Sequence, residues 1–266
     1  MIALPDRYLV AKTDPNTFAT DEIGWYAVQV CANDIATTGA APLWFLATLL
    51  LPDGSATADL ARAIFAQMGA ACRDLGVTVV GGHSEVTYGL DRPIVVGCML
   101  GEVAPERLVR TGGARPGDAI LLTKGAPVEA AAIVAREKRQ ELAGHFPKDL
   151  LDRAAAFLHA PGISVVRDAA VAMSVGGVTS MHDPTEGGVV AALCRFFGLD
   201  PACAIASGAL LLTVTPARLP AMLDTYARAG IPVYHLGRMT AGPFAVCDVT
   251  RGALARPLVD EIARLF

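Results

Sequence analysis

The chain has 266 residues, of which 53% are hydrophobic and 18% charged, and its formal net charge is −4. Such an apolar composition excludes a disordered chain and predicts a substantial buried core, divided most simply into two domains. The slight negative charge and the scattered arginines exclude the basic surface that a nucleic-acid partner requires.

Strands and helices are expected to alternate along the first half of the sequence. Residues 7–13 predict a strand that ends at Asp14-Pro15, and residues 21–38 predict a helix that stops at Gly39, a residue favoured just after a helix. The other elements predicted in this half are strands at 43–51, 77–80 and 92–103, an amphipathic helix at 57–75, and a polar loop at 81–91.

A polar, turn-rich stretch at residues 104–118 predicts a boundary between an N-terminal domain at 1–108 and a C-terminal domain at 109–266. The strands predicted after it lie at 119–123, 209–214, 232–238 and 243–249, with one more just before the motif HDPTEGG. The helices predicted there lie at 126–141, 148–158, 163–174, 217–229 and 255–265, with one more from that motif to Gly198. Both halves therefore favour an α/β or α+β fold.

The sequence carries no signal for a membrane or for secretion. Its most apolar run, residues 43–51, is far shorter than the roughly 20 residues of a membrane span. The first 15 residues lack the basic cluster and long apolar stretch of a signal peptide. The six cysteines are far apart and form no C-x-x-C pair, so they predict reduced core thiols. We expect a cytoplasmic protein without a membrane partner.

The motif HDPTEGG allows a structural and a functional interpretation. Asp183 and Glu186 suit the capping positions of a helix. Capping does not explain Gly187 and Gly188, which would each cost a helix roughly 1 kcal/mol relative to alanine. A bare helix N-terminus beside the Thr185 hydroxyl is a suitable anion site, typically for phosphate. From this segment alone, plain capping is the favoured alternative.

Three aspartates come from three different elements. Asp34 lies in the apolar stripe of the helix at 21–38, near its C-terminal end, where the helix dipole disfavours a negative charge. Such a carboxylate needs a cation, hydrogen-bond donors or a raised pKa, or else Asn33 and Asp34 simply bond to the following loop. Asp14 also has an ordinary turn explanation. With Asp183, these acids offer the oxygen ligands that Mg²⁺ prefers, and together they favour a metal–nucleotide site.

A second candidate site follows the predicted strand at 77–80. Gly81 and Gly82 permit a close approach of the backbone, and His83 and Glu85 could serve as ligands or as acid and base. A simple turn is the structural alternative.

Five segments resemble, in this order, the superfamily of aminoimidazole ribonucleotide (AIR) synthetase. They read KTDP, CANDIATTGAAPLWF, VVGGHSEVT, RTGGARPGDAILLTKG and MHDPTEGGV. Relatives in this superfamily include the hydrogenase-maturation carbamoyl dehydratase, selenophosphate synthetase and thiamine-monophosphate kinase. The resemblance implies a two-domain AIR synthase-like α/β (α+β) fold. It also implies a homodimer whose N-terminal domains form a dimer-spanning β-barrel, a C-terminal α/β sandwich, and ATP in a cleft near the interface.

The resemblance also implies a chemistry and a set of site residues. ATP and Mg²⁺ would be the cofactors, and the γ-phosphoryl group would pass to an amide- or carbonyl-type oxygen of a small molecule or a protein terminus. Catalysis of this kind consists mainly of positioning and charge neutralisation. The implied metal ligands are Asp14, Asp34 and Asp183, the implied nucleotide-binding residues are Asn33, Gly81, Gly82, Thr185, Gly187 and Gly188, and the candidate catalytic residues are His83, Glu85 and Lys124. A solvated lysine at a strand end is the alternative for Lys124.

The sequence also departs from the pattern that the resemblance implies. Only MIALPDRYLVA precedes the TD pair, where family members usually carry a segment such as G-D-D-A-A, so a metal ligand and part of the phosphate loop are missing unless Asp6 or another residue substitutes. The chain ends in IARLF, without the C-terminal cysteine of the carbamoyl dehydratase, and it lacks the N-terminal cysteine–lysine arrangement of selenophosphate synthetase. A catalytically inactive nucleotide-binding or maturation-partner paralogue is therefore the alternative.

Overall fold

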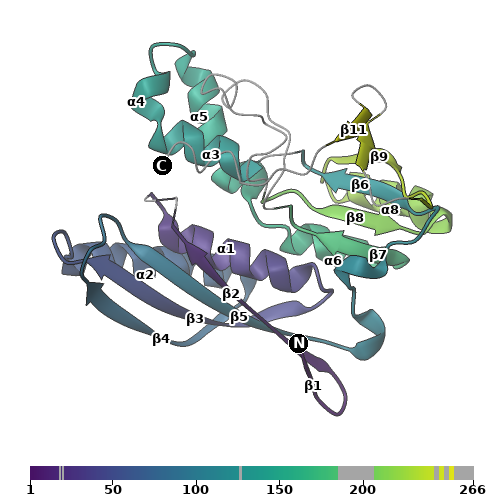
Figure 1. Ribbon diagram of the computed structural model, residues 1–266, viewed down its shortest axis with the longest axis horizontal. Helices are drawn as coiled ribbons and strands as arrows, with labels where there is room; N and C mark the ends of the chain where they lie inside the picture. Colours follow the sequence, from purple (N-terminus) through teal and green to yellow (C-terminus); the bar gives the residue numbers. More distant parts are fainter. Residues whose placement is uncertain are drawn as a thin grey trace.

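The computed structural model describes residues 1–17, 19, 21–125, 128–184, 207–242, 246–248 and 252–254. Its first half is built on a mixed sheet with strand order β1-β2-β5-β3-β4, in which only the β3–β4 pair among the described pairs is parallel. The strands are β1 (Ile2–Ala3), β2 (Tyr8–Asn16), β3 (Ala41–Pro52), β4 (Thr78–Thr87) and β5 (Ile94–Val103). Helices α1 (Ile23–Ala36) and α2 (Ala58–Leu75) cover one face of this sheet (Figure 1).

The second half has its own sheet, with strand order β7-β8-β6-β9 and only antiparallel pairs. Its strands are β6 (Ala119–Thr123), β7 (Val178–His182), β8 (Leu211–Val214) and β9 (Val233–Arg238). Helices α6 (Val166–Val175) and α8 (Leu219–Arg228) share a hydrophobic core with it. The remaining elements are α3 (Val128–Glu137), α4 (Arg139–Leu142), α5 (Lys148–Ala156), the hairpin β10 (Val246–Asp248) and β11 (Gly252–Leu254), and short helical turns at Pro105–Arg107, Thr111–Gly113, Leu158–Gly162 and Pro216–Arg218.

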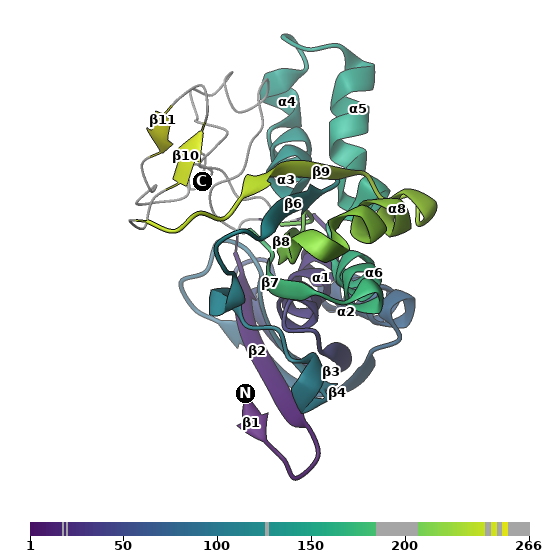
Figure 2. The ribbon, with the colours of Figure 1, turned by 90° about the vertical axis from the view of Figure 1, so that its right-hand side faces the viewer.

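Helix α1 lies between these two halves, as both ribbon views show (Figure 1 and Figure 2). Most of its residues are apolar, and all of them are buried except Trp25 and Asp34. Cys31 and Ile35 belong to the core of the first sheet, whereas Tyr26 packs with α3 and α5 and Ala36 with the core of the second sheet. A helix buried on all sides can position polar groups toward several neighbours at once.

Two expectations about the first sheet are corrected. The strand predicted at 7–13 does not end at Asp14-Pro15 but continues to Asn16. Pro15 pairs with Val96 of β5 on one side, while β1 reaches only Tyr8 and Leu9 on the other side of β2. The missing N–H of a proline is tolerated where a strand has no second partner.

The polar loop predicted at 81–91 is wrong for its first seven residues, which belong to β4. They pair with residues 46–52 of β3. At Gly82, whose φ is 156°, a Cβ atom would stand only 2.1 Å from the backbone oxygen of Ala47, so this glycine is required by strand pairing. Because β4 is an exposed edge strand, it lacks the apolar alternation that predicts a half-buried strand.

Most other predicted elements are confirmed with small shifts of their ends. The helix predicted at 57–75 is α2, which begins after the capping side chain of Thr57 and ends at Gly76 in the left-handed conformation. The helix predicted at 126–141 is divided into α3 and α4 at Lys138. The helices predicted from the HDPTEGG motif to Gly198 and at 255–265 lie outside the described residues.

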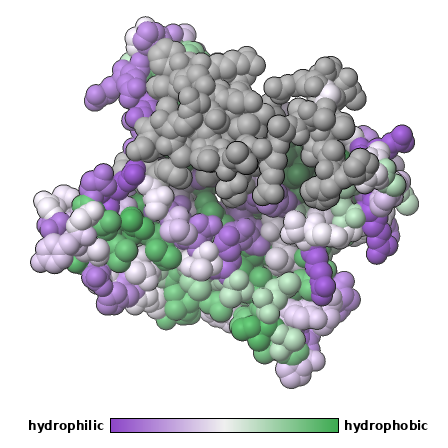
Figure 3. Space-filling model, in the orientation of Figure 1, coloured by the Kyte–Doolittle hydropathy of each residue, from purple (hydrophilic) through white to green (hydrophobic). Residues whose placement is uncertain are grey.

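The first sheet is open within one chain, and the expected dimer-spanning β-barrel stays a prediction. Its face opposite α1 and α2 is apolar and only half-buried. Leu46, Leu50 and Leu100 lie on that face, since they alternate with buried residues along β3 and β5. In Figure 3, apolar side chains gather over the lower part of the molecule, where the first sheet lies. Within the described residues, no helix is both long and apolar enough to cross a membrane.

Candidate functional site

The first cluster of the site joins β2 to α1. Side chains alternate along β2, so Lys12 and Asp14 both point to the face that α1 covers. Lys12 Nζ lies 3.3 Å from Asp14 Oδ2 and 3.0 Å from Asp34 Oδ2. The half-buried Asp34 expected from the apolar stripe thus meets a cation, one of the solutions that such a carboxylate requires. We call Lys12, Asp14 and Asp34 the acid–lysine cluster.

The electrostatics of this cluster follow from partial burial. Burial raises the pKa of Asp34, and the ammonium of Lys12 opposes that rise without cancelling it. Burial alone would lower the pKa of Lys12, but the two carboxylates reverse this and its pKa is raised. His182 lies near Asp34, and burial lowers the pKa of this imidazole. The cluster therefore pairs two carboxylates with one ammonium, so it holds one positive group fewer than acidic groups.

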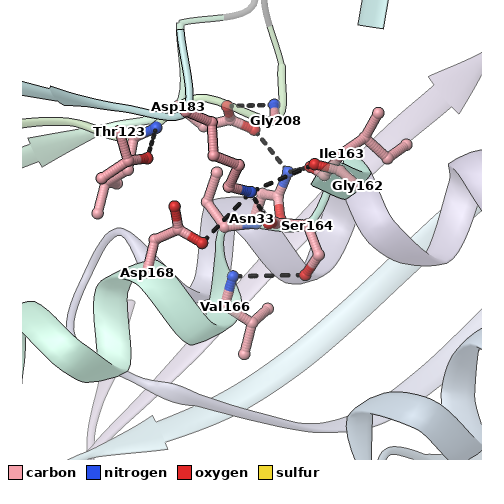
Figure 4. Close-up of polar contacts among 12 residues, drawn as sticks. Asn33, Thr123, Gly162, Ile163, Ser164, Val166, Asp168, Asp183 and Gly208 are labelled. Atoms are coloured by element: carbon pink, nitrogen blue, oxygen red, sulfur yellow. Dashed lines mark hydrogen bonds and ion pairs between the residues drawn. The ribbon is translucent and has the colours of Figure 1, made fainter. Parts of the chain in front are cut away.

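The second cluster joins α1 to the second half of the chain (Figure 4). The fully buried Asn33 donates from Nδ2 to Asp183 Oδ2 and to the carbonyl of Ile163, both at 2.8 Å, and its Oδ1 accepts from the N–H of Val165 at 2.7 Å. Asp183 Oδ1 accepts from the N–H of Gly208 at 3.2 Å. Burial raises the pKa of Asp183 well above its usual value. This carboxyl is thus held by protein donors rather than left open.

Lys124 follows β6 with a positive φ of 58°, and its side chain is buried, not a solvated lysine at a strand end. Its Nζ lies 3.3 Å from Asp168 Oδ2 and also donates to the carbonyls of Gly162 and Ser164 (Figure 4). Both side chains of the ion pair are almost completely buried, and burial lowers the pKa of Lys124. The lysine therefore joins β6 to α6.

The structure does not bring His83 and Glu85 to the acid–lysine cluster. Asp14, Gly97, Ala47 and Gly82 form one row across the sheet, so His83, the next residue of β4, points to the opposite face. His83 and Glu85 are mostly exposed, with 3.5 Å between Nε2 and Oε2.

The remaining nucleotide-binding candidates are divided between two regions. Gly81 and Gly82 line a hollow of about 310 Å³ beside Phe65, at the β4 edge. Thr185, Gly187 and Gly188 lie outside the described residues.

The expected three-acid metal site is only partly assembled. Within the described residues, no group of three or more His, Cys, Asp or Glu side chains is placed to hold a metal ion. Asp14 and Asp34 converge on one point, which the ammonium of Lys12 takes, whereas both oxygens of Asp183 already accept hydrogen bonds. Asp6 does not substitute, because it pairs with Arg7 in the turn before β2, at the end of the strand remote from Asp14. Two carboxylates thus fit a divalent cation, provided that Lys12 moves.

Sequence reasoning missed Lys12 and Asp168. Lys12 had a usable signal, because a residue two positions before Asp14 on a strand points to the same face. No sequence signal pointed to Asp168, since its contact with Lys124 joins elements that are distant in the sequence.

Comparisons with known proteins agree with this architecture. The sequence model described as AIR synthase related protein, N-terminal domain, matches residues 1–103, and the model of the C-terminal domain matches residues 115–198. Carbamoyl dehydratase HypE of Rhizobium leguminosarum bv. viciae is 30% identical over 270 residues, covering 91% of this chain and 72% of the relative. The chain belongs to the AIR synthase-related family.

Other members of this family are similar over most of their length. Carbamoyl dehydratase HypE of Cupriavidus necator is 32% identical over 245 residues, covering 84% of this chain and 68% of that protein. The crystal structure of E. coli HypE has a TM-score of 0.79 at 17% identity and covers 97% of this chain and 88% of its own. A HypE structure in complex with ATP has a TM-score of 0.71 at 23% identity, and the match covers 90% of this chain and 78% of that one. The superfamily expected from the five motifs is thereby confirmed.

Proposed function

We propose that this AIR synthase-related chain is a Mg²⁺- and ATP-dependent enzyme that transfers the γ-phosphoryl group to an amide- or carbonyl-type oxygen of an acceptor. Its sequence relatives are named carbamoyl dehydratases, and one solved structure of similar fold is a complex with ATP. The observation that carries the proposal is that Asp14 and Asp34, from two separate elements, both pair with the ammonium of Lys12. Paired carboxylates are the usual protein ligands of the magnesium that accompanies a nucleotide.

The residues of the chain would contribute position and charge. A divalent ion, when bound, supplies positive charge beside the phosphates, which is a large part of catalysis in phosphoryl transfer. Asp14 and Asp34 would hold that ion, and Lys12 would turn its ammonium toward the phosphates or solvent. Asn33, through Asp183 and the segment at 163–165, fixes the second half of the chain against α1. We infer that the chain has two domains, at 1–108 and 109–266, and that α1 of the first domain packs against the second.

We expect Asp34→Asn to lower ADP formation from ATP and candidate acceptors at least 100-fold, because an amide has no charge with which to hold the cation. The matched control is Asp59→Asn on α2, an exposed carboxylate that pairs with Arg62 and should leave turnover unchanged. ADP formation is measured in a coupled assay with magnesium present. An unaffected Asp34→Asn enzyme would contradict the proposed site, and a wild-type chain that binds ATP without turnover would identify the inactive paralogue.

Lys12→Met is expected to tighten Mn²⁺ binding at least tenfold, because the ammonium no longer competes for the two carboxylates. At roughly 4 Å and an intermediate dielectric, two unit charges interact by about 4 kcal/mol, which exceeds the ~1.4 kcal/mol of a tenfold change. Free Mn²⁺ is measured by electron paramagnetic resonance. Lys148→Met, at an exposed position on α5, is the control. Equal Mn²⁺ affinity of the wild-type, Lys12→Met and Lys148→Met proteins would mean that the cation does not bind between Asp14 and Asp34.

We also propose a homodimer formed through the open face and the β4 edge of the first sheet. Among the described strands, β4 has β3 as a neighbour on one side only, and exposed apolar edge strands and sheet faces are usually covered by a partner. Leu46→Lys, on the open face, is expected to yield monomers in sedimentation velocity, while Ala63→Lys on the exposed side of α2 should remain dimeric. A wild-type monomer at high concentration, or a dimeric Leu46→Lys, would contradict this interface. His83 and Glu85 would lie at such an interface.

A further inference from the structure

The ammonium of Lys12 occupies the position that the proposed function gives to a divalent cation. Its Nζ lies 3.0 Å from Asp34 Oδ2 and 3.3 Å from Asp14 Oδ2, so it contacts the same two carboxylates that would hold the ion. Within the described residues, no third acid lies within ion-pair distance of this ammonium. The chain thus supplies its own counter-ion to Asp14 and Asp34, and that counter-ion has no other described acid to move to.

Lys12 can leave this position, but it cannot move far. Its side chain is 39% exposed, and β1 pairs only with Tyr8 and Leu9, so among the described strands Lys12 lies beside a free edge of β2. Its backbone is fixed, because Lys12 pairs with Met99 of β5 and stands two residues before Asp14. Neighbouring residues on one face of a strand are roughly 7 Å apart, so the displaced ammonium stays beside a cation held by Asp14.

A divalent ion between the two carboxylates would therefore face an ammonium that has lost its acids. Two positive groups a few ångströms apart repel each other in a partly buried site, which weakens the binding of a metal ion that arrives alone. A polyphosphate removes this repulsion, because its oxygens can contact the metal ion and accept hydrogen bonds from the ammonium at the same time. The position of Lys12 thus favours a cation that brings its own anion.

We propose that Lys12 makes the cation site selective for a metal–polyphosphate complex over the free divalent ion. This selectivity rests on the proposed function, because Asp14 and Asp34 are taken as the ligands of the cation. Lys12 competes with a metal ion that arrives alone, and it pairs with phosphate oxygens when the complex binds. It is a specificity-determining residue of the site, beyond the charge that it contributes there.

Free Mn²⁺ and its complex with AMPPCP, a non-hydrolysable ATP analogue, are the two ligands to compare on the full chain. Binding of free Mn²⁺ is measured by electron paramagnetic resonance and binding of Mn²⁺–AMPPCP by isothermal titration calorimetry. Lys12→Met is expected to tighten the binding of free Mn²⁺ at least tenfold without tightening that of Mn²⁺–AMPPCP. The preference of the site for the complex should therefore fall at least tenfold.

Two further variants of Lys12 separate the effect of its charge from that of its shape. Lys12→Arg keeps a positive group and should keep the preference for Mn²⁺–AMPPCP within threefold. Lys12→Gln removes the charge, is expected to behave like Lys12→Met, and serves the same comparison if methionine impairs folding. An unchanged preference in the uncharged variants, or an equal loss of preference in Lys12→Arg, would overturn the role of Lys12.

Asp34→Asn distinguishes a failure of this inference from a failure of the proposed function. If Asp34→Asn weakens the binding of Mn²⁺–AMPPCP while Lys12→Met leaves the preference unchanged, the role of Lys12 is wrong and the cation site stands. If Asp34→Asn binds Mn²⁺–AMPPCP as tightly as the wild-type chain, the cation does not lie between Asp14 and Asp34. The proposed function then loses the observation that carries it.

Discussion

Replacement of Asn33 by leucine is expected to lower the free energy of unfolding by about 3–5 kcal/mol, measured by urea denaturation. The variant removes the donor to Asp183 Oδ2 and leaves the carbonyl of Ile163 and the N–H of Val165 unpaired in the interior. It also deprives a buried carboxyl of one of the two donors that the described residues supply. Because these contacts join α1 to the second half of the chain, the loss should affect the whole cooperative transition.

Asn16→Leu is the matched control, because the buried amide nitrogen of Asn16 has no partner in the part of the chain that the structure describes, and little stability should depend on it. The pH dependence gives a second readout. Burial raises the pKa of Asp183 while Asn33 opposes that rise, so the folded state binds more protons than the unfolded state above about pH 4, the ordinary range of an aspartate. Stability attributable to this group is therefore lost as pH rises, and the loss should be steeper in Asn33→Leu. Equal effects of Asn33→Leu and Asn16→Leu would contradict this assignment.

Lys124→Met is expected to cost about 3–5 kcal/mol of stability, measured by thermal and urea unfolding. It leaves Asp168 buried without its cation, and a buried charge that has lost its partner is far more unfavourable than the pair itself. The double variant Lys124→Met/Asp168→Leu should recover most of this loss, because it removes both charges together.

The exposed pair between Arg62 and Asp59 provides the comparison for this second prediction. Both side chains are largely in solvent, so Arg62→Met should change stability by less than about 1 kcal/mol. If Lys124→Met were equally mild, the buried pair would not be a stabilising contact between β6 and α6. If the double variant were no better than Lys124→Met, the lost hydrogen bonds to Gly162 and Ser164 would dominate over charge.

Local features of the sequence determined much of the secondary structure and the family. The spacing of apolar residues at 57–75 and the capping residues at both ends suffice for α2, since a helix is stabilised by contacts three and four residues apart. The position of Asp34 in an apolar stripe likewise predicted a carboxylate that needs a cation, hydrogen-bond donors or a raised pKa. The order of five short motifs predicted the family that the sequence comparisons confirm.

The tertiary structure alone decided which polar residues meet. Whether Asp14 pairs with Lys12 and Asp34, and whether His83 lies on the same face, depends on the register and order of β2, β5, β3 and β4. Asn33 and Asp183 are 150 residues apart, and their contact exists only because α1 packs into three separate cores. Local periodicity constrains neighbours within a few residues, whereas these contacts are set by sheet pairing and helix packing over the whole chain.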